Sequence, residues 1–214
     1  MASTGVAVPL PRIQHRDQAE HPHVREEQRG QEWRAADEPL GDERALGDGR
    51  VNKDDPQPEA YGTVDEASAA LGLARAVAVS PETSETILEI QRDLYALMAE
   101  LAATPESAGR FRSIGSGRVA WLEARIDAFG SRVEMPSGFI VPGDTLGSAA
   151  LDFARTVVRR AERAAARLLH AGRLANPDTL AYLNRLSSLC FVLELWEIAC
   201  SRAGPPTLAK DAGA

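Results

Sequence analysis

The stretch 86–101, TILEIQRDLYALMAEL, decides the fold class, because its apolar residues recur at alternating steps of three and four. That spacing places them on one side of an α-helix, which can then pack against other helices. Ser80-Pro81 offers a cap before this stretch and Thr104-Pro105 a stop after it, so we predict a helix that ends near Ala103. The apolar stripe consists of Ile87, Ile90, Leu94, Leu97 and Leu101.

Outward from this helix, four more segments show the same period. The last one opens at Asn176-Pro177-Asp178, a cap followed by proline, and is apolar on most faces, so it should lie centrally or at a subunit interface. No alternating strand of useful length is present. We therefore predict an all-α fold, a five-helix up-and-down bundle over residues 50–203. The four segments are 59–79, 117–130, one that carries Leu151 to Leu168, and 176–202.

The two ends of the chain lack this period. Residues 1–49 are rich in charged residues, Gln, Gly and Pro, and cannot bury enough surface to offset the entropy of ordering. We expect a mostly disordered, polar tail there and a flexible tail at 204–214. No metal site is predicted, since the tail histidines have no ligand spacing. These are His15, His21 and His23.

Charge and hydropathy exclude two classes of partner. The formal net charge of -7 argues against nucleic acid, because neutralising phosphates requires surplus Lys and Arg. No run approaches the roughly 20 apolar residues that span a bilayer, and the amino terminus has no signal pattern, so we expect a cytoplasmic protein without a membrane partner. Cys190 and Cys200 are expected on one helix about 15 Å apart, too far for a disulfide.

The fourth segment contains the first candidate for chemistry. Arg155, Arg159 and Glu162 are spaced i, i+4, i+7 and line one face. Guanidinium groups at that spacing suit phosphate oxygens, and a carboxylate in the row can orient them. Taken alone, this helix favours a solvated charged face with internal ion pairs, and phosphate binding is the alternative.

A second candidate lies at the start of the first segment. Lys53 in Lys53-Asp54-Asp55-Pro56 stands just before a helix start, where free backbone N–H groups and the helix dipole favour an anion. Asp65, farther along, is a natural partner for an arginine. An ordinary polar helix entry is the alternative, and in isolation it is the better interpretation.

Taken together, five segments resemble the PduO-type ATP:cob(I)alamin adenosyltransferase family, in its order. The resemblance extends from about Arg50 to about Ala203. The segments are Lys53-Asp54-Asp55-Pro56, Ala60-Tyr61-Gly62-Thr63-Val64-Asp65-Glu66, Phe139-Ile140-Val141-Pro142-Gly143, the run 154–163 and Tyr182-Leu183-Asn184-Arg185-Leu186-Ser187.

The resemblance implies a homotrimeric helical bundle that transfers the 5′-deoxyadenosyl group of ATP to cob(I)alamin, with ATP, cobalamin and Mg²⁺ meeting at subunit interfaces. In this picture Asp65 and Arg155 form a salt bridge between subunits. Phe139 lies beneath the corrin and displaces its lower axial ligand. The ATP-binding residues would be Lys53, Arg159, Arg160, Glu162 and Asn184.

The sequence departs from the family pattern at three places that concern ligands. The family's loop Thr-Gly-Asp-x-Gly-x-Thr, which wraps the triphosphate, is replaced by the shorter, threonine-free run 41–49. Asp144 replaces the second glycine of a Pro-Gly-Gly turn, where a positive φ would be strained, and Ser188 replaces an Asp. A non-catalytic relative that binds cobalamin or a nucleotide, and a purely structural bundle, therefore remain as alternatives to the enzyme.

Overall fold

The computed structural model describes residues 41–44, 50–104 and 106–210, which belong to one compact unit. Five helices of 15 to 25 residues dominate it, and a two-stranded antiparallel hairpin precedes them. The elements are β1 (Asp42–Arg44), β2 (Arg50–Asn52), α2 (Pro56–Val77), α3 (Pro81–Ala102), α4 (Ala108–Phe111), α5 (Ser116–Gly130), α6 (Leu146–His170) and α7 (Pro177–Ser201).

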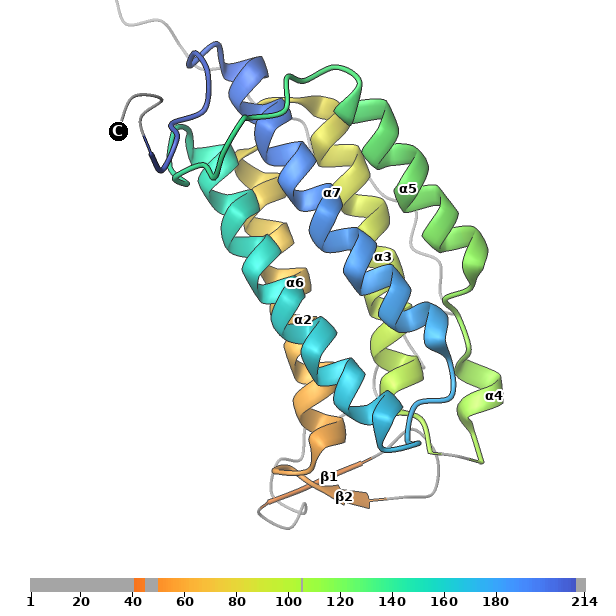
Figure 1. Ribbon diagram of the computed structural model, residues 1–214. Helices are drawn as coiled ribbons and strands as arrows, with labels where there is room; N and C mark the ends of the chain where they lie inside the picture. Colours follow the sequence, from red (N-terminus) through yellow and green to blue (C-terminus); the bar gives the residue numbers. More distant parts are fainter. Residues whose placement is uncertain (1–40, 45–49, 105, 211–214) are drawn as a thin grey trace, which may run out of the picture. The chain divides into compact units, whose positions relative to one another are not determined.

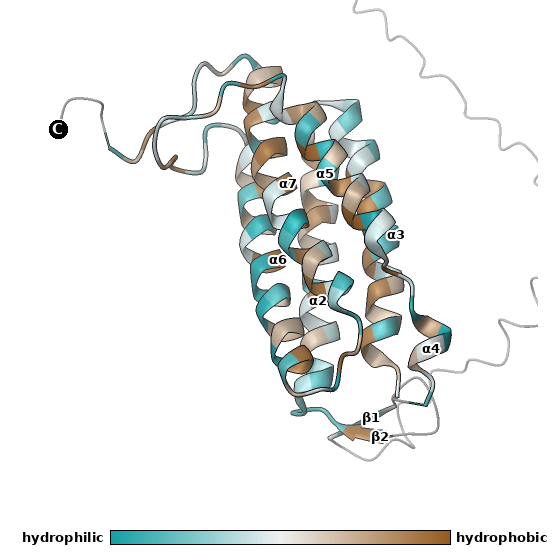
Figure 2. Ribbon diagram, turned by 45° about the vertical axis from the view of Figure 1, so that its right-hand side comes forward, coloured by the Kyte–Doolittle hydropathy of each residue, from teal (hydrophilic) through white to brown (hydrophobic). Residues whose placement is uncertain are grey.

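The long helices run alternately up and down, side by side, as Figure 1 shows. Helix α6 packs against α2 on one side and α7 on the other, and α7 also contacts α3 and α5. The predicted all-α bundle is confirmed, and so is the central position of α7. In Figure 2 apolar and polar residues alternate along the helices, as expected of helices that pack on one side. Among the described residues, no helix is long and apolar enough to cross a membrane.

Each long helix except α5 begins at a side-chain cap that satisfies a free backbone N–H. Asp55 accepts from the backbone N–H of Gln57 at 2.8 Å, and Ser80 accepts from that of Thr83 at 3.4 Å. Asn176 caps α7 in the same way. At α6, Thr145 and Ser148 bond reciprocally in a capping box. Caps at Ser80 and Asn176 were expected from the prolines that follow them.

The reversal between α2 and α3 is held by the far end of α7. Glu197, fully buried, accepts from the backbone N–H groups of Val79 at 2.7 Å and Ser80 at 3.1 Å. Trp196 donates its indole N–H to the Ser80 hydroxyl at 3.0 Å. A buried carboxylate needs such donors to offset its desolvation, so this turn is as firmly bound as the core around it.

The predicted stripes form the core. All five members of the 87–101 stripe are at most 3 % exposed, as are the predicted stripe residues of α6. On α5, Leu122 and Phe129 are buried, whereas Val119 and Ile126 pack against the core only in part. The periodicity therefore predicted which side of each helix faces inward.

Two small elements were not predicted. Strands β1 and β2 pair with Glu43 opposite Val51, and each has only three residues, too few for an alternating pattern to register in the sequence. Helix α4 is a single turn. Residues 42–44 form strand β1, inside the segment 1–49 for which we predicted a mostly disordered tail. Residues 1–40 and 45–49, with the three histidines, lie outside the described part of the chain.

The tail predicted after residue 203 makes backbone contacts as far as Ala209, and its flexibility stays a prediction. The C-terminal segment, residues 204–210, returns along the α5–α6 loop, residues 131–145, and Ile140 and Leu208 form an antiparallel bridge. The backbone N–H of Val141 donates to the carbonyl of Thr207 at 2.8 Å. Backbone pairing of this kind leaves no period in the sequence, so composition alone suggested a free end.

Candidate functional site

A hollow of about 750 Å³ opens between α6, α7 and the α5–α6 loop. Three residues singled out in the sequence line it: Phe139 from the loop, and Arg155 and Arg159 from α6. Phe139 is 90 % exposed, which is unusual for a large apolar side chain. The wall of the hollow also contains Asp152, Ser187, Ser188, Phe191 and Val192.

One of the two arginines is held by its own helix. Arg155 donates to Asp152 Oδ1 from Nε at 2.9 Å and from Nη2 at 2.6 Å, an i, i+3 pair. The guanidinium is thereby oriented along the wall of the hollow. Arg159 stands one helical turn later on the same wall and is exposed, so its donors can reach a ligand in the hollow.

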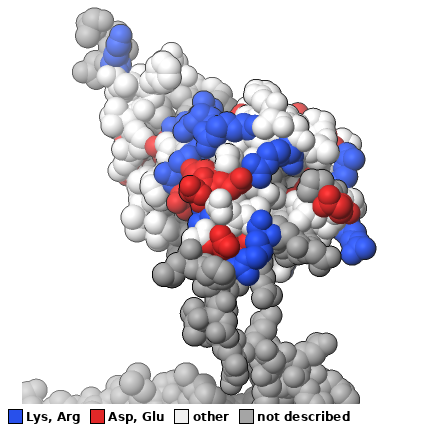
Figure 3. Space-filling view, turned by 90° about the horizontal axis from the view of Figure 1, so that it is seen from below, with Lys and Arg blue, Asp and Glu red and all other residues white. Residues whose placement is uncertain are grey.

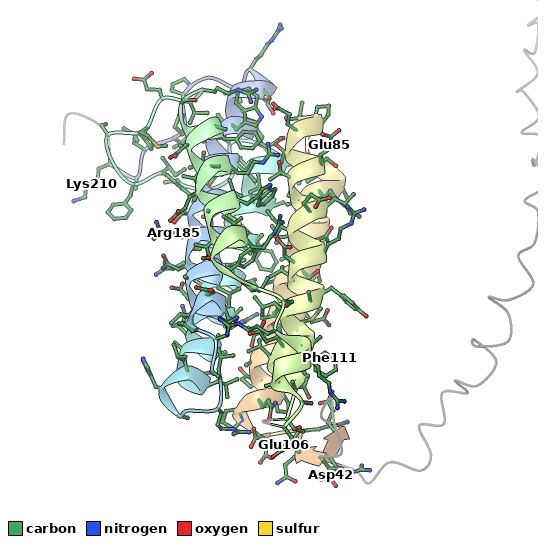
Figure 4. All side chains as sticks on the ribbon, turned by 90° about the vertical axis from the view of Figure 1, so that its right-hand side faces the viewer. Asp42, Glu85, Glu106, Phe111, Arg185 and Lys210 are labelled. Carbon is green, nitrogen blue, oxygen red and sulfur yellow. The ribbon has the colours of Figure 1, made fainter. Side chains whose placement is uncertain are left out.

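Glu162 and Asn184 meet across α6 and α7. Asn184 donates from Nδ2 to Glu162 Oε1 at 2.7 Å, and Arg185 donates to Asn184 Oδ1 at 2.6 Å. These residues border a second, shallower hollow of about 440 Å³, farther along the α6–α7 face. Arg185 is labelled in Figure 4, on the side of the bundle. The arrangement presents a carboxylate and an amide to the same surface.

The remaining predicted residues lie on the α2 side of α6. Arg160 forms an ion pair with Glu66 of α2, and Asp65 is the exposed neighbour of Glu66. Lys53 is exposed just before α2, and its backbone N–H donates to the carbonyl of Gly41 at 2.8 Å. Figure 3, seen from below, shows positive and negative side chains intermixed at this end of the bundle.

The cap of α2 carries an ion pair of its own. Arg173, after α6, donates to Asp55 Oδ1 at 2.8 Å and Oδ2 at 3.2 Å. This hydrogen bond, with the one from the Gln57 backbone, holds the pKa of Asp55 below its ordinary value. The start of α2, where Lys53 stands, is therefore fixed to the end of α6 by a charged carboxylate.

Within one chain, the predicted residues fall into two half-sites on opposite sides of α6. We call the first the corrin half-site, after the ligand that the resemblance implies: it is the α6–α7 face with Phe139, Arg155, Arg159, Glu162 and Asn184. The α2 half-site contains Lys53, Asp65 and Arg160. Sequence reasoning missed Asp152 and Glu66, the partners of two of the arginines. The i, i+3 spacing of Asp152 and Arg155 could have signalled the first, but nothing local signals the second.

The departures from the family pattern have defined places. Ser188 lies in the wall of the larger hollow, with its hydroxyl 3.5 Å from the carbonyl oxygen of Asn184. The expected strain at Asp144 is wrong, since Gly143 takes the positive φ of 128° and Asp144 does not. The Asp144 carboxylate instead accepts from Thr207, from the hydroxyl at 2.6 Å and from the backbone N–H at 3.0 Å. These bonds lower the pKa of Asp144.

A buried carboxyl group lies behind the hollow. Glu194 of α7 is 1 % exposed, and its Oε2 has no hydrogen-bond partner among the described residues. Burial raises the pKa of Glu194 to about 7, with a further rise from Asp152 and a smaller opposing effect from Arg155. No pattern in the sequence singled out this residue.

The described residues contain no group of three or more His, Cys, Asp or Glu side chains that could hold a metal ion. Cys190 is buried and Cys200 is partly buried, and both are free thiols. Burial raises the pKa of Cys190 to about 12, so this thiol is an unreactive core group.

Comparison with protein families identifies the chain. The model of the cobalamin adenosyltransferase family matches residues 39–197. The chain belongs to this family. The match includes both half-sites and the hairpin before α2, and it ends before the C-terminal segment.

Curated relatives in the family differ in length. The corrinoid adenosyltransferase PduO of Salmonella typhimurium is 43 % identical over 148 residues, which are 67 % of this chain but only 43 % of the relative. The corrinoid adenosyltransferase of Bacillus subtilis is 35 % identical over 147 residues, 67 % of this chain and 75 % of the relative. The chain thus spans less than half of the length of PduO and most of the shorter relative.

Solved structures in the family share the fold. A variant of the PduO-type ATP:corrinoid adenosyltransferase of Lactobacillus reuteri, complexed with cobalamin and ATP, aligns with a TM-score of 0.72 at 32 % identity, over 80 % of this chain and 92 % of that one. A second variant from the same organism, complexed with ATP, also gives 0.72, at 31 % identity.

Proposed function

We propose that the protein transfers the 5′-deoxyadenosyl group of ATP to cob(I)alamin, forming adenosylcobalamin and releasing triphosphate. One observation carries this proposal: an almost fully exposed phenylalanine stands at the rim of an arginine-walled hollow. A large ring displayed to water costs free energy unless a ligand covers it. A corrin is a wide, largely apolar macrocycle, and the hollow presents an aromatic group toward one side of such a ligand.

Phe139 has a specific chemical task in this reaction. Its ring would occupy the lower face of the corrin and displace the lower axial ligand, and it offers no donor atom to replace it. Four-coordinate Co(II) is more easily reduced to Co(I) by an external one-electron donor. The lone pair of Co(I) then attacks the 5′ carbon of ATP, a cobalt–carbon bond forms, and the carbon–oxygen bond breaks with its electron pair leaving on triphosphate.

The charged residues would position ATP and stabilise its leaving group. Arg159 and Arg160 supply guanidinium donors for phosphate oxygens, and Lys53 adds a point charge beside the start of α2. Glu162 and Asn184, already bonded to each other, can accept from or donate to the nucleoside. We assign catalysis to this positioning and charge stabilisation, without a covalent enzyme intermediate. Mg²⁺ enters as part of the substrate, MgATP, because phosphate oxygens and water are its preferred ligands.

We further propose that the working unit is a homotrimer in which the corrin half-site of one subunit meets the α2 half-site of the next. Support comes from the position of Arg160 and Asp65 on the opposite side of α6 from Phe139. It also comes from exposed apolar residues on the α2 and α6 surface, which a second copy could cover. Asp65 would then reach Arg155 of the neighbour. These residues are Leu73 of α2 and Leu146 and Phe153 of α6.

We place this reaction in the cytoplasm. The free thiols of Cys190 and Cys200 agree with a reducing compartment, and ATP is available there. Fractionation of cells that produce the protein, with the adenosyltransferase activity measured in each fraction, tests this location. Activity confined to an extracytoplasmic fraction would contradict it.

A non-catalytic relative that carries cobalamin or a nucleotide is the second candidate. The threonine-free run 41–49 favours it, because the family's triphosphate loop is replaced there by a short polar stretch. In this case the corrin half-site would bind its ligand without turnover.

The deciding experiment is an anaerobic assay with MgATP and chemically reduced cob(I)alamin, followed by the loss of Co(I) absorbance and the formation of adenosylcobalamin. Enzyme-dependent turnover by the full chain supports the transferase. Tight binding of cobalamin without turnover by a folded oligomer would favour the carrier. No binding of either ligand would sink both candidates.

A further inference from the structure

The C-terminal segment contacts the α5–α6 loop beside the residue that the proposed mechanism uses as a wedge. The backbone N–H of Ala209 donates to the carbonyl of Phe139 at 2.7 Å, and that of Val141 donates to the carbonyl of Thr207 at 2.8 Å. Ile140 and Leu208 lie opposite each other between these bonds. The segment thus bonds to the loop at Phe139 and again at Val141, while the side chain of Phe139 is 90 % exposed.

The carboxylate of Asp144 adds two further hydrogen bonds between the loop and the C-terminal segment. Asp144 Oδ1 accepts from the Thr207 hydroxyl at 2.6 Å, and Oδ2 accepts from the Thr207 N–H at 3.0 Å. With its carbonyl bonded to Val141, Thr207 uses its N–H, its hydroxyl and its C=O on the loop. Hydrogen bonds to a charged acceptor are stronger than those between neutral groups. Asp144 and Thr207 therefore form a latch between two segments far apart in the sequence.

The path of the chain brings the segment back at small entropic cost. Helix α7 ends at Arg202, which has a left-handed φ of 54°, and Gly204 follows with a φ of 93°. Pro205-Pro206 then restrict the chain just before Thr207, because proline fixes φ. Lys210, labelled in Figure 4, marks the end of the segment, at the opposite end of the bundle from Asp42 and Glu106.

Apart from these hydrogen bonds, the C-terminal segment packs loosely against the rest of the protein. Leu208, Pro205 and Pro206 border a hollow of about 370 Å³ with Met135, Pro136 and Ile198, so this side of the segment is not closely packed. The hydrogen bonds to residues 139–144 are consequently what defines its position. The family pattern has glycine at position 144, and glycine has no side chain that could form such a latch.

We propose that Asp144 is a positioning residue for Phe139: through Thr207 it locks residues 207–209 onto the loop and holds the aromatic ring at the height where it meets the corrin. This inference rests on the proposed function, in which Phe139 displaces the lower ligand of cobalamin. Without the latch, the loop samples more conformations, and a smaller fraction of bound cobalamin becomes four-coordinate. ATP binding, which uses residues of α6 and the start of α2, is unaffected.

The test compares Asp144→Ala, Asp144→Asn and Thr207→Val with Glu89→Gln, a control on the exposed outer face of α3. The full-length protein is loaded with cob(II)alamin and MgATP, and the four-coordinate fraction is measured by absorbance and electron paramagnetic resonance. Removing two charge-assisted bonds should lower that fraction about tenfold in Asp144→Ala, and removing one should lower it about threefold in Thr207→Val. Asp144→Asn keeps one acceptor oxygen but loses the charge, so its four-coordinate fraction should lie between those of Asp144→Ala and the wild type. KM for ATP stays unchanged throughout.

A second readout needs no ligand. Amide hydrogen exchange at Val141 and Ala209 should be faster in Asp144→Ala than in the wild type and in Glu89→Gln, because these amides open with the latch. A wild-type four-coordinate fraction in Asp144→Ala would overturn the proposal. A parallel loss of ATP binding and thermal stability in Asp144→Ala would also overturn it, because it would mean that the substitution damages the whole fold. If the wild type itself forms no four-coordinate cobalamin, the proposed function fails, while the exchange data still report whether the latch exists.

Discussion

The two half-sites differ in shape and in how their charges are used. The corrin half-site is concave, with an exposed aromatic ring and two arginines along one wall. The α2 half-site borders a smaller hollow of about 220 Å³, and its Arg160 is already neutralised by Glu66 of the same chain. A concave, partly apolar surface suits a macrocycle, and a paired polar surface suits a partner subunit or a phosphate that replaces the pair. The contrast agrees with the proposal that the two halves meet across a subunit interface.

The largest expected effect separates the wedge from nucleotide binding. Phe139→Ala should lower adenosylation about 100-fold, because the reacting cobalt is no longer brought to the four-coordinate state, while ATP affinity changes little. Single-turnover kinetics with cob(II)alamin and a reductant, together with calorimetric ATP binding, measure the two effects. Equal loss of both would contradict a wedge and indicate a damaged fold. Phe139→Leu, which keeps apolar bulk, should fall between.

A mixed oligomer tests whether the half-sites come from different subunits. Phe139→Ala and Lys53→Ala chains should each be nearly inactive alone, whereas random mixing leaves about a quarter of the interfaces with both halves intact. Purification of co-expressed chains through two different affinity tags removes the homotrimers, and each mixed trimer keeps one intact interface of three, so activity should recover to about a third of wild type. Recovery no better than the average of the two single variants would place both residues in one subunit's site.

Arg159→Ala should act mainly on the nucleotide. Loss of a guanidinium that contacts phosphate weakens ATP binding about tenfold, with cobalamin binding nearly unchanged. Titration of each ligand separately provides the measurement. Arg163→Ala, an exposed arginine of the same helix outside the half-sites, is the matched control. An unchanged affinity for ATP in Arg159→Ala would remove this residue from the site.

The smallest expected effect is on the pH dependence of stability, through Glu194, which is buried behind the corrin half-site. Glu194 has a folded pKa of about 7, above the ordinary value of 4.5, so between these values the folded state binds more protons than the unfolded state. Stability should therefore fall as pH rises through that window. Glu194→Gln, neutral at all pH values, should be more stable than wild type by about 1–2 kcal/mol at pH 8.

Thermal unfolding at several pH values measures this difference. At pH 4, where wild-type Glu194 is protonated in both states, the advantage of Glu194→Gln should vanish. Glu89→Gln, which lies in an exposed ion pair, should show no such pH dependence. A constant difference between Glu194→Gln and wild type at all pH values would contradict the proposed cause.

The helical bundle could be predicted from the sequence because helix packing imposes a periodic pattern on neighbouring residues. The stripe from Ile87 to Leu101 and the caps at Ser80 and Asn176 are read from neighbouring residues, and the structure has them where they were expected. Arg155 and Arg159 were placed on one wall for the same reason: helical spacing determines which side chains share a face.

What the sequence missed depends on contacts between distant residues. Glu66 meets Arg160 across 94 positions, and Asp144 meets Thr207 across 63. No local period encodes such pairs. From the sequence alone, Asp144 looked like a strained replacement of glycine. In the structure its side chain bonds to Thr207, which belongs to a segment predicted as a flexible tail.

The buried Glu197 has a consequence for where this chain tolerates change. Reversals between helices are usually exposed and accept insertions, but the one at 78–80 donates two backbone N–H groups to a carboxylate with no exposed surface. Lengthening or cutting the chain there would leave that carboxylate buried without donors. The exposed turn at 171–173, between α6 and α7, carries no such bond to a buried charge, and it is the better place to open the chain for a circular permutation or a domain insertion.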